Sequence, residues 1–243
     1  MKMISFANRN AKEILRDPLT LSFGLGFPLV LILLLSAIQA NIPVSLFEIQ
    51  HLTPGVTVFG LSFMTLFSAT LIAKDRGSSL LQRLYTTPMK PIDFILGYTL
   101  PILPFAVAQC VICYVVAIIL GLDVTVNILP AILLIIPVSL FYIALGLLFG
   151  SILNDKQVGG ICGALLTNLS AWLSGIWFDL ELVGGAFKKI SYALPFVHAV
   201  DLERAALVGN FSVILEHLIW VMAYTVVSMI IAVLLFLRQM KKQ

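Results

Sequence analysis

The sequence predicts an all-α integral membrane protein with six transmembrane helices, on two observations. Of its 243 residues, 60% are hydrophobic and only 11% are charged, whereas a soluble domain carries about 25% charged residues. The apolar residues also form long stretches without charge, and a helix needs about 20 such residues to cross a bilayer. The expected spans are residues 19–40, 54–73, 95–121, 128–153, 158–177 and 217–237.

The segment before the first span is expected to form an amphipathic helix. Apolar residues recur in it at helical spacing, and basic residues occupy the opposite face. Such a helix can lie at the membrane surface with its basic side towards anionic lipid; the alternative is a helix packed on a partner. The apolar positions are Ile4, Ala7, Ala11, Ile14 and Leu15, and the charged ones are Arg9, Lys12, Glu13 and Arg16. No cleaved signal peptide is expected, because no small-residue cleavage site follows a short apolar segment.

The basic residues give the orientation. With six spans both termini lie on one side, and that side receives all but three of the fifteen lysines and arginines. The three on the other side are Lys188, Lys189 and Arg204. Cytoplasmic loops are enriched in Lys and Arg, so both termini are expected in the cytoplasm. The net charge of +3 is then a matter of topology and gives no reason to expect nucleic acid as a partner.

Several kinds of chemistry are disfavoured. No Asp, Glu, Lys or Arg is expected in the middle of a span, whereas ion-coupled carriers bury such residues. No glycine-rich loop carries the lysine needed to cradle phosphates, so ATP and Mg²⁺ would have to be bound by a separate subunit. The three histidines are not spaced as metal ligands, and Cys110 with Cys113 fits packing better than redox chemistry. The chain itself is expected to bind no cofactor or metal and not to be an enzyme.

Two connections are longer than packed helices need, and function is expected there: a cytoplasmic segment, 74–93, and an outer segment, 179–212. In the first, Ser78 or Ser79 can cap a short helix that Pro88 and Pro91 end. Its apolar face, formed by Leu80, Leu81, Leu84 and Tyr85, would either dock into a groove on a partner or lie back on the membrane.

These two segments also carry a family resemblance. The first contains Asp75-Arg76-Gly77, Leu81-Gln82-Arg83-Leu84, Thr87-Pro88, Asp93 and Leu96-Gly97. The second, beginning in the last residues of span 5, contains Ser174-Gly175-Ile176-Trp177-Phe178, Leu180-Glu181, Leu194-Pro195, His198-Ala199 and Arg204. In this order and spacing the sequence resembles the membrane permease subunits of ATP-binding-cassette exporters of the second type. It departs from the family pattern at Gln82, where glutamate is usual, and at Asp179 and Gly184-Gly185, where prolines are usual.

The resemblance implies a single transmembrane permease domain over residues 1–243. It pairs with a second permease copy, expected to be itself, and with two cytoplasmic ATPase subunits that bind ATP and Mg²⁺. The loop helix after span 2 would couple the ATPases to the spans. This role is carried over to Arg76, Gly77, Leu80, Leu81, Arg83, Leu84 and Pro88. The outer segment would form re-entrant helical hairpins that close the outer mouth, with a gate at Phe178, Glu181, Pro195 and His198.

The expected function is therefore export driven by ATP hydrolysed on another subunit, in a plasma or inner cell membrane and in a bacterial source. The alternatives are a membrane tether that recruits a cytoplasmic partner without transport, and a secondary carrier, which the uncharged spans disfavour. The substrate-binding residues are unknown. The apolar interior, with aromatic residues such as Phe59 and Phe63, favours a hydrophobic or amphipathic cargo, drug-like or lipid-like, although position by position packing explains these rings as well.

Overall fold

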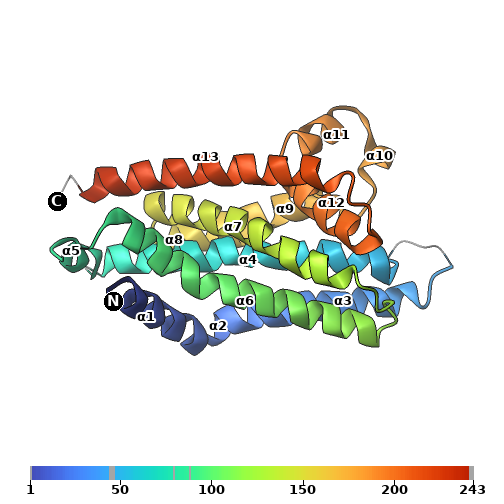
Figure 1. Cartoon of the computed structure of the whole chain (residues 1–243), viewed down its shortest axis with the longest axis horizontal. Helices are drawn as coiled ribbons and strands as arrows, with labels where there is room; N and C mark the ends of the chain where they lie inside the picture. Colours follow the sequence, from blue (N-terminus) through green and yellow to red (C-terminus); the bar gives the residue numbers. More distant parts are fainter. Residues whose placement is uncertain (1, 44–46, 79, 88, 241–243) are drawn as a thin grey trace.

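The chain was analysed as a computed structural model that describes residues 2–43, 47–78, 80–87 and 89–240. These residues form helices and connecting turns, with no strand among them, which confirms the all-α membrane fold (Figure 1). The elements in chain order are α1 (Lys2–Arg16), α2 (Pro18–Leu21), the π-helical η1 (Ser22–Gly26), α3 (Phe27–Gln39), α4 (Ile49–Gly77), α5 (Leu80–Tyr85), α6 (Pro91–Ile119), α7 (Ile128–Ile152), α8 (Asp155–Val158), the π-helical η2 (Gly159–Leu166), α9 (Thr167–Leu173), α10 (Leu180–Val183), α11 (Gly185–Tyr192), α12 (Pro195–Val208) and α13 (Ile214–Met240).

Five helical segments are long and apolar enough to cross a membrane. They are Pro18–Gln39, Ile49–Gly77, Pro91–Ile119, Ile128–Ile152 and Phe211–Arg238. The sixth expected span, 158–177, falls on α8, η2 and α9, where Lys156, Gln157 and Asn168 make the helix less apolar than the other five. In Figure 1, α8 lies towards the α5 end of the bundle and α9 lies beside α12 at the other. The sixth span remains a prediction.

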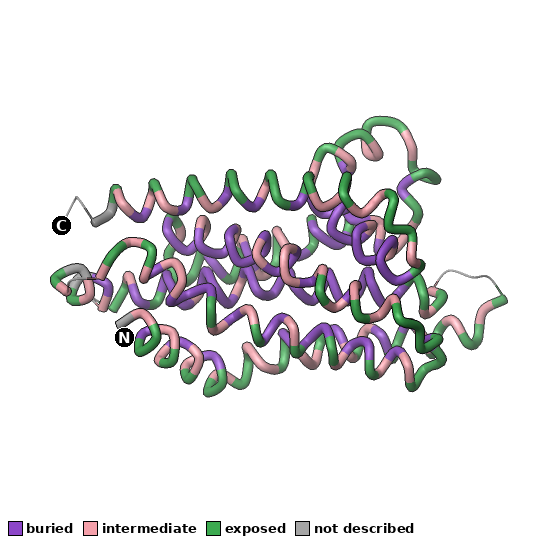
Figure 2. The backbone as a smooth tube through the Cα atoms, in the orientation of Figure 1, coloured by how far each residue is buried: buried purple, intermediate pink, exposed green. Residues whose placement is uncertain are grey.

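Helix α4 occupies the centre of the bundle (Figure 2). In the most apolar stretch of α4, 89% of the residues are buried, against 22% in the most apolar stretch of Phe211–Arg238. The close partner of α4 is α7, and two glycines of α7 permit the approach. A Cβ on Gly146 would lie 2.8 Å from the Thr65 carbonyl oxygen, and one on Gly150 would lie 2.9 Å from the Ala69 backbone. Both glycines therefore serve close helix packing.

The two ends of the bundle differ. The start of α1, the end of α13 and α5 lie at one end, and α10, α11 and the start of α4 lie at the other (Figure 1). The location of both termini in the cytoplasm stays a prediction. Helix α12 is largely buried against α4, α7 and α13. It begins at Pro195 and ends at Val208, and the following Gly209 has a φ of +81°, which suits a residue without a side chain.

Helix α1 has the amphipathic pattern that the sequence predicts. Its apolar face is continuous, but the bundle covers only one edge of it: Ile14 is buried, while Ile4 and Leu15 are each 64% exposed. The buried edge towards α6 consists of Phe6, Asn10 and Ile14, which follow one another at four-residue spacing. The other edge of the apolar face points away from the bundle.

Candidate functional site

The first candidate site is the base of segment 74–93, where Asp75 joins three helices. Asp75 lies near the end of α4 and is only 1% exposed. Its Oδ2 accepts hydrogen bonds from Arg9 Nη1 of α1 at 2.7 Å and from the Tyr98 hydroxyl of α6 at 2.8 Å. Charge-assisted bonds of this length are the stronger kind in proteins. Asp75 therefore fixes the end of α4 to both neighbouring helices.

Helix α1 is seated on α6 at Gly97. Asn10 Nδ2 donates to the Gly97 carbonyl oxygen at 3.0 Å. The Phe6 ring lies where a Cβ on Gly97 would be, and it packs edge-on against Tyr98 at 5.0 Å between ring centroids. A side chain at position 97 would push α1 away. The glycine that closes the first family motif is thus required by the contact with the first helix.

Arg76 points into the bundle. Its Nη1 donates to the carbonyl oxygens of Gly150 at 2.7 Å and Leu153 at 3.2 Å. The last carbonyls of a helix have no partner within the helix, so Arg76 caps the end of α7. The residue expected to contact an ATPase therefore also positions α7 relative to α4. No contact described here tests its coupling role.

The short helix α5 follows directly and turns its apolar side inward. Leu81 is 2% exposed and belongs to the core, and Leu84 packs against that core while half-buried. Arg83 and Gly77 are exposed, and Leu80 is half-buried. Pro88 lies outside the described residues, as do the side chains of Gln82 and Tyr85. The exposed side of α5 is thus its polar side.

Two threonines close α5. The Thr86 hydroxyl donates to the Arg83 carbonyl at 2.7 Å and the Thr87 hydroxyl donates to the Leu84 carbonyl at 2.6 Å. Helix α6 then begins at Pro91, and the Lys90 backbone N–H donates to Asp93 Oδ2 at 2.8 Å. Hydroxyl and carboxylate groups satisfy the free ends of both helices. These local bonds explain why the segment folds back after one short helix.

At the other end of the bundle, Arg204 joins the two halves of the second motif. Its Nη2 donates to the Gly175 carbonyl oxygen at 3.0 Å, and its Nη1 lies 3.7 Å from Asp201 Oδ1. Gly175 has a φ of +69°, which other residues rarely adopt. Burial lowers the pKa of Arg204 and raises the pKa of Asp201. Arg204 thereby ties α12 to the turn after α9.

Beside this contact lies a cavity of about 440 Å³, within the size range of ligand pockets. It opens between the start of α4, the turn after α9 and α12. The side chains around it include His51, Trp177, Phe178, Asp179, Asp201 and Arg204. Of the four expected gate residues, only Phe178 lines this cavity. The structure does not bring all four together.

The other three gate residues are distributed around the outer segment. Glu181 is exposed and accepts a hydrogen bond from Lys188 Nζ at 2.5 Å, which ties α10 to α11. Pro195 forms the first residue of α12 and is buried. His198 lies one turn later and faces α13. Their role as a gate stays a prediction.

His198 makes a contact that the sequence did not predict. Its Nδ1 lies 2.9 Å from Nδ1 of His217, its Nε2 lies 3.0 Å from the Tyr192 carbonyl oxygen, and its ring stacks on Trp220 at 4.8 Å. A carbonyl only accepts, so His198 Nε2 carries a proton and its neutral ring accepts at Nδ1. Burial, opposed by the bond to Tyr192, lowers the pKa of His198. Within the described residues, no three His, Cys, Asp or Glu side chains gather as metal ligands.

Glu203 is a second residue that sequence reasoning missed. It lies in the expected outer segment, 179–212, but it is 0% exposed in α12. Its Oε2 accepts from the Tyr114 hydroxyl at 3.4 Å, and its Oε1 has no partner among the described residues. Burial raises the pKa of Glu203 well above the ordinary value. Its position four residues from apolar Ala199 and Leu207 was the signal that it faces the core.

Comparison with known sequences completes this description. The sequence model of the family described as ABC-2 type transporter matches residues 2–208. The match includes both motif segments and ends before α13. A search of curated proteins found no match to the chain.

Proposed function

The chain belongs to the ABC-2 type transporter family, and from that premise we propose that it is the transmembrane permease subunit of an ATP-driven exporter. A separate cytoplasmic ATPase subunit binds ATP and Mg²⁺ and is present in two copies per complex. The permease moves a hydrophobic or amphipathic cargo outward. The membrane is a plasma or inner cell membrane, and the end of the bundle that carries α5 and both termini faces the cytoplasm.

The observation that carries the proposal is the rigid seating of α5. Asp75 and Arg76, which precede it, bind α1, α6 and α7 through side-chain hydrogen bonds. A push on α5 is therefore transmitted to several spans at once. The ATPase contacts the exposed side of this segment, where Gly77 and Arg83 lie, while Leu81 and Leu84 hold α5 to the bundle.

The second permease copy packs against the face of η2 and α9 that points away from the bundle. A Cβ on Gly159 or Gly160 would have no neighbour within 4 Å, so a second helix can approach there closely. Asn168 is exposed on the same helical segment, and within the described part of the chain its side chain donates to the Ala164 carbonyl at 2.8 Å. A polar side chain facing lipid is costly. A symmetric partner that accepts hydrogen bonds from this face removes that cost.

An apolar cargo is supported by an aromatic ladder along α4. The rings of Phe59 and Phe63 lie 5.8 Å apart, Phe63 contacts Phe27 at 5.7 Å, and Phe59 contacts Trp177 at 5.9 Å. Phe59 and Phe63 are buried, but Phe27 and Phe23 on the α3 side are 37% and 46% exposed. An apolar or aromatic cargo that approaches this side meets ring faces and edges.

The test is a charge reversal on α5. Arg83→Glu should abolish co-purification of the chain with its ATPase and abolish export, because it reverses an exposed charge without touching the core. Lys189→Glu, an equally exposed reversal at the opposite end, is the matched control and should leave both intact. Normal ATPase binding and export by Arg83→Glu would contradict the assignment of α5. ATPase binding by the unaltered chain without any export would favour the membrane tether.

A further inference from the structure

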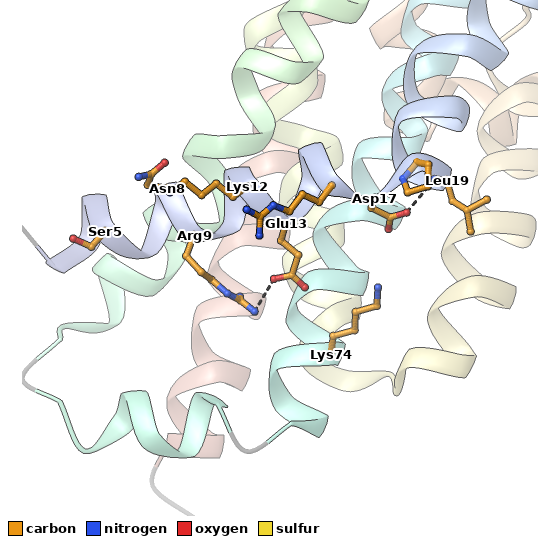
Figure 3. Close-up of a pocket in the computed structure, with 10 residues that line it drawn as sticks. Ser5, Asn8, Arg9, Lys12, Glu13, Asp17, Leu19 and Lys74 are labelled. Carbon is orange, nitrogen blue, oxygen red and sulfur yellow. Dashed lines mark hydrogen bonds and ion pairs between the residues drawn. The ribbon is translucent and has the colours of Figure 1, made fainter.

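A charged cleft of about 810 Å³ opens between α1 and the end of α4. Its walls are Ser5, Asn8, Arg9, Lys12, Glu13, Arg16, Asp17, Pro18, Leu19 and Lys74 (Figure 3). Lys74 rises from α4 towards the part of α1 that carries Glu13, so both walls contribute charge. The volume falls in the range of small-molecule sites.

The acidic side chains of the cleft are already used by other groups. Glu13 is paired with Arg9 at 2.6 Å. Asp17 caps α2, where its Oδ1 accepts from the backbone N–H of Leu19 at 3.0 Å and its Oδ2 from the Thr20 hydroxyl at 3.1 Å. A carboxylate at a helix N-terminus is stabilised by the helix dipole. Both carboxylates keep their charge, but the four basic residues of the lining outnumber them, so the cleft is net positive.

Three cations of the cleft have no ion-pair partner among the described residues. Lys12, Arg16 and Lys74 are exposed, and no ion pair includes them. They converge from two helices on one concave space. Like charges held together in this way attract an anion, and three donors around one cleft suit a phosphate group.

Exposed apolar side chains border the cleft on one side. Leu19, which lines it, is 68% exposed, and Leu15 on the preceding turn is 64% exposed. From Pro18 onward the chain enters its first candidate span. The cleft thus lies at the boundary between charged and apolar surface, where a phosphate group lies next to the start of an acyl chain.

We propose that this cleft binds the headgroup of an anionic phospholipid, with Lys12, Arg16 and Lys74 around the phosphate and Leu15 and Leu19 beside the acyl chains. Only the choice of leaflet, the cytoplasmic one, rests on the orientation given in the proposed function. The binding site itself does not depend on that orientation. A bound headgroup would bridge α1 and α4 next to the contact between Arg9 and Asp75. The lipid would thereby hold α1 against the bundle at the base of the α5 segment.

Native mass spectrometry of the full chain in mild detergent tests this proposal, with phosphatidylglycerol as the probe and phosphatidylcholine as the neutral comparison. A basic residue near an anionic lipid surface contributes about fivefold in affinity. The variant Lys12→Gln/Lys74→Gln should therefore bind phosphatidylglycerol about 25-fold more weakly and phosphatidylcholine unchanged. The control Lys156→Gln/Lys189→Gln removes two exposed cations outside the cleft and should bind as the unaltered chain does.

The conservative variant Lys12→Arg/Lys74→Arg keeps the charges and should bind phosphatidylglycerol normally, which separates a binding defect from a folding defect. Equal losses in the cleft variant and in the control would overturn the site in favour of diffuse attraction. Displacement of the lipid by millimolar glycerol phosphate would overturn the lipid as ligand in favour of a soluble phosphate. Since no outcome depends on ATPase or export, failure here leaves the proposed function untouched.

Discussion

The Arg9 guanidinium donates to the Asp75 carboxylate at 2.7 Å, across 66 positions of the chain. Asp75 is buried, whereas Arg9 is 39% exposed at its side chain. The pair therefore fixes a surface helix to the central helix immediately before the segment that we assign to the ATPase contact. It also explains why an acidic residue begins the first family motif.

Arg9→Gln should destabilise the chain by about 1–3 kcal/mol, because it leaves the buried Asp75 carboxylate with Tyr98 as its remaining donor. Unfolding in mixed detergent micelles measures the loss. The double variant Arg9→Gln/Asp75→Asn should be less destabilised than the sum of the two single variants. Strict additivity would show that the two side chains do not interact.

Arg76→Gln should loosen the end of α7, because two carbonyl oxygens lose a charged donor. A loss of about 1.4 kcal/mol corresponds to a tenfold faster exchange where local opening governs it. Hydrogen exchange of the amides between residues 151 and 158 is the measurement. Arg83→Gln is the matched control, and equal exchange in the two variants would contradict the capping role.

Glu203→Gln should stabilise the chain at neutral and alkaline pH. The folded state raises the pKa of this carboxyl, so its contribution to stability is fully present below the unfolded value near 4.5 and is lost as the pH rises towards the folded value. The amide cannot ionise and removes that loss. Melting temperatures between pH 5 and 8 test it against Glu216→Gln, an exposed carboxyl; the same slope in both would contradict the prediction.

Mild acid should lower the stability of the contact between α12 and α13, because His198 lies in it. Burial lowers its pKa below the ordinary 6.5, so stability is fully present above that value and declines as the pH falls below it. In the neutral state His198 Nδ1 accepts a hydrogen bond from His217 Nδ1. A proton added to His198 Nδ1 would replace this hydrogen bond by two N–H groups that point at each other. The nearby Asp201 and Glu216 act in the opposite direction.

His198→Phe keeps a ring on Trp220 and removes the titrating group. Its melting temperature should therefore vary less between pH 7.5 and 5.5 than that of the unaltered chain. His51→Gln, an exposed histidine, should behave as the unaltered chain does. An unchanged pH dependence in His198→Phe would exclude this histidine as the cause.

Features that depend on residues close together in the sequence were predictable. Apolar runs of bilayer length predict the five helices that qualify as spans among the described residues, and Pro88 and Pro91 predict the short length of α5. Helix α12 was expected within the outer segment, but its burial was not. The face of α12 towards the bundle carries Glu203. From the sequence alone, a charged residue outside the apolar runs is expected to be exposed to water.

Partners far apart in the sequence were not predictable. Arg9 was expected on an outward basic face, but its partner Asp75 lies on another helix. His198 and His217 are separated by a turn between α12 and α13, and no local pattern indicates that their rings meet. The motif arginines Arg76 and Arg204 were recognised by position alone. The structure shows that each binds backbone carbonyl oxygens of another segment.

The most direct test of the permease assignment is purification of the tagged chain from its native membrane in mild detergent, with stoichiometry by mass spectrometry. We expect recovery of an ATP-binding-cassette ATPase in equal amount to this chain, as two copies of each. The variant Arg83→Glu should lose the ATPase and keep the second permease copy. Recovery of the chain alone, or with an unrelated protein, would contradict the permease assignment.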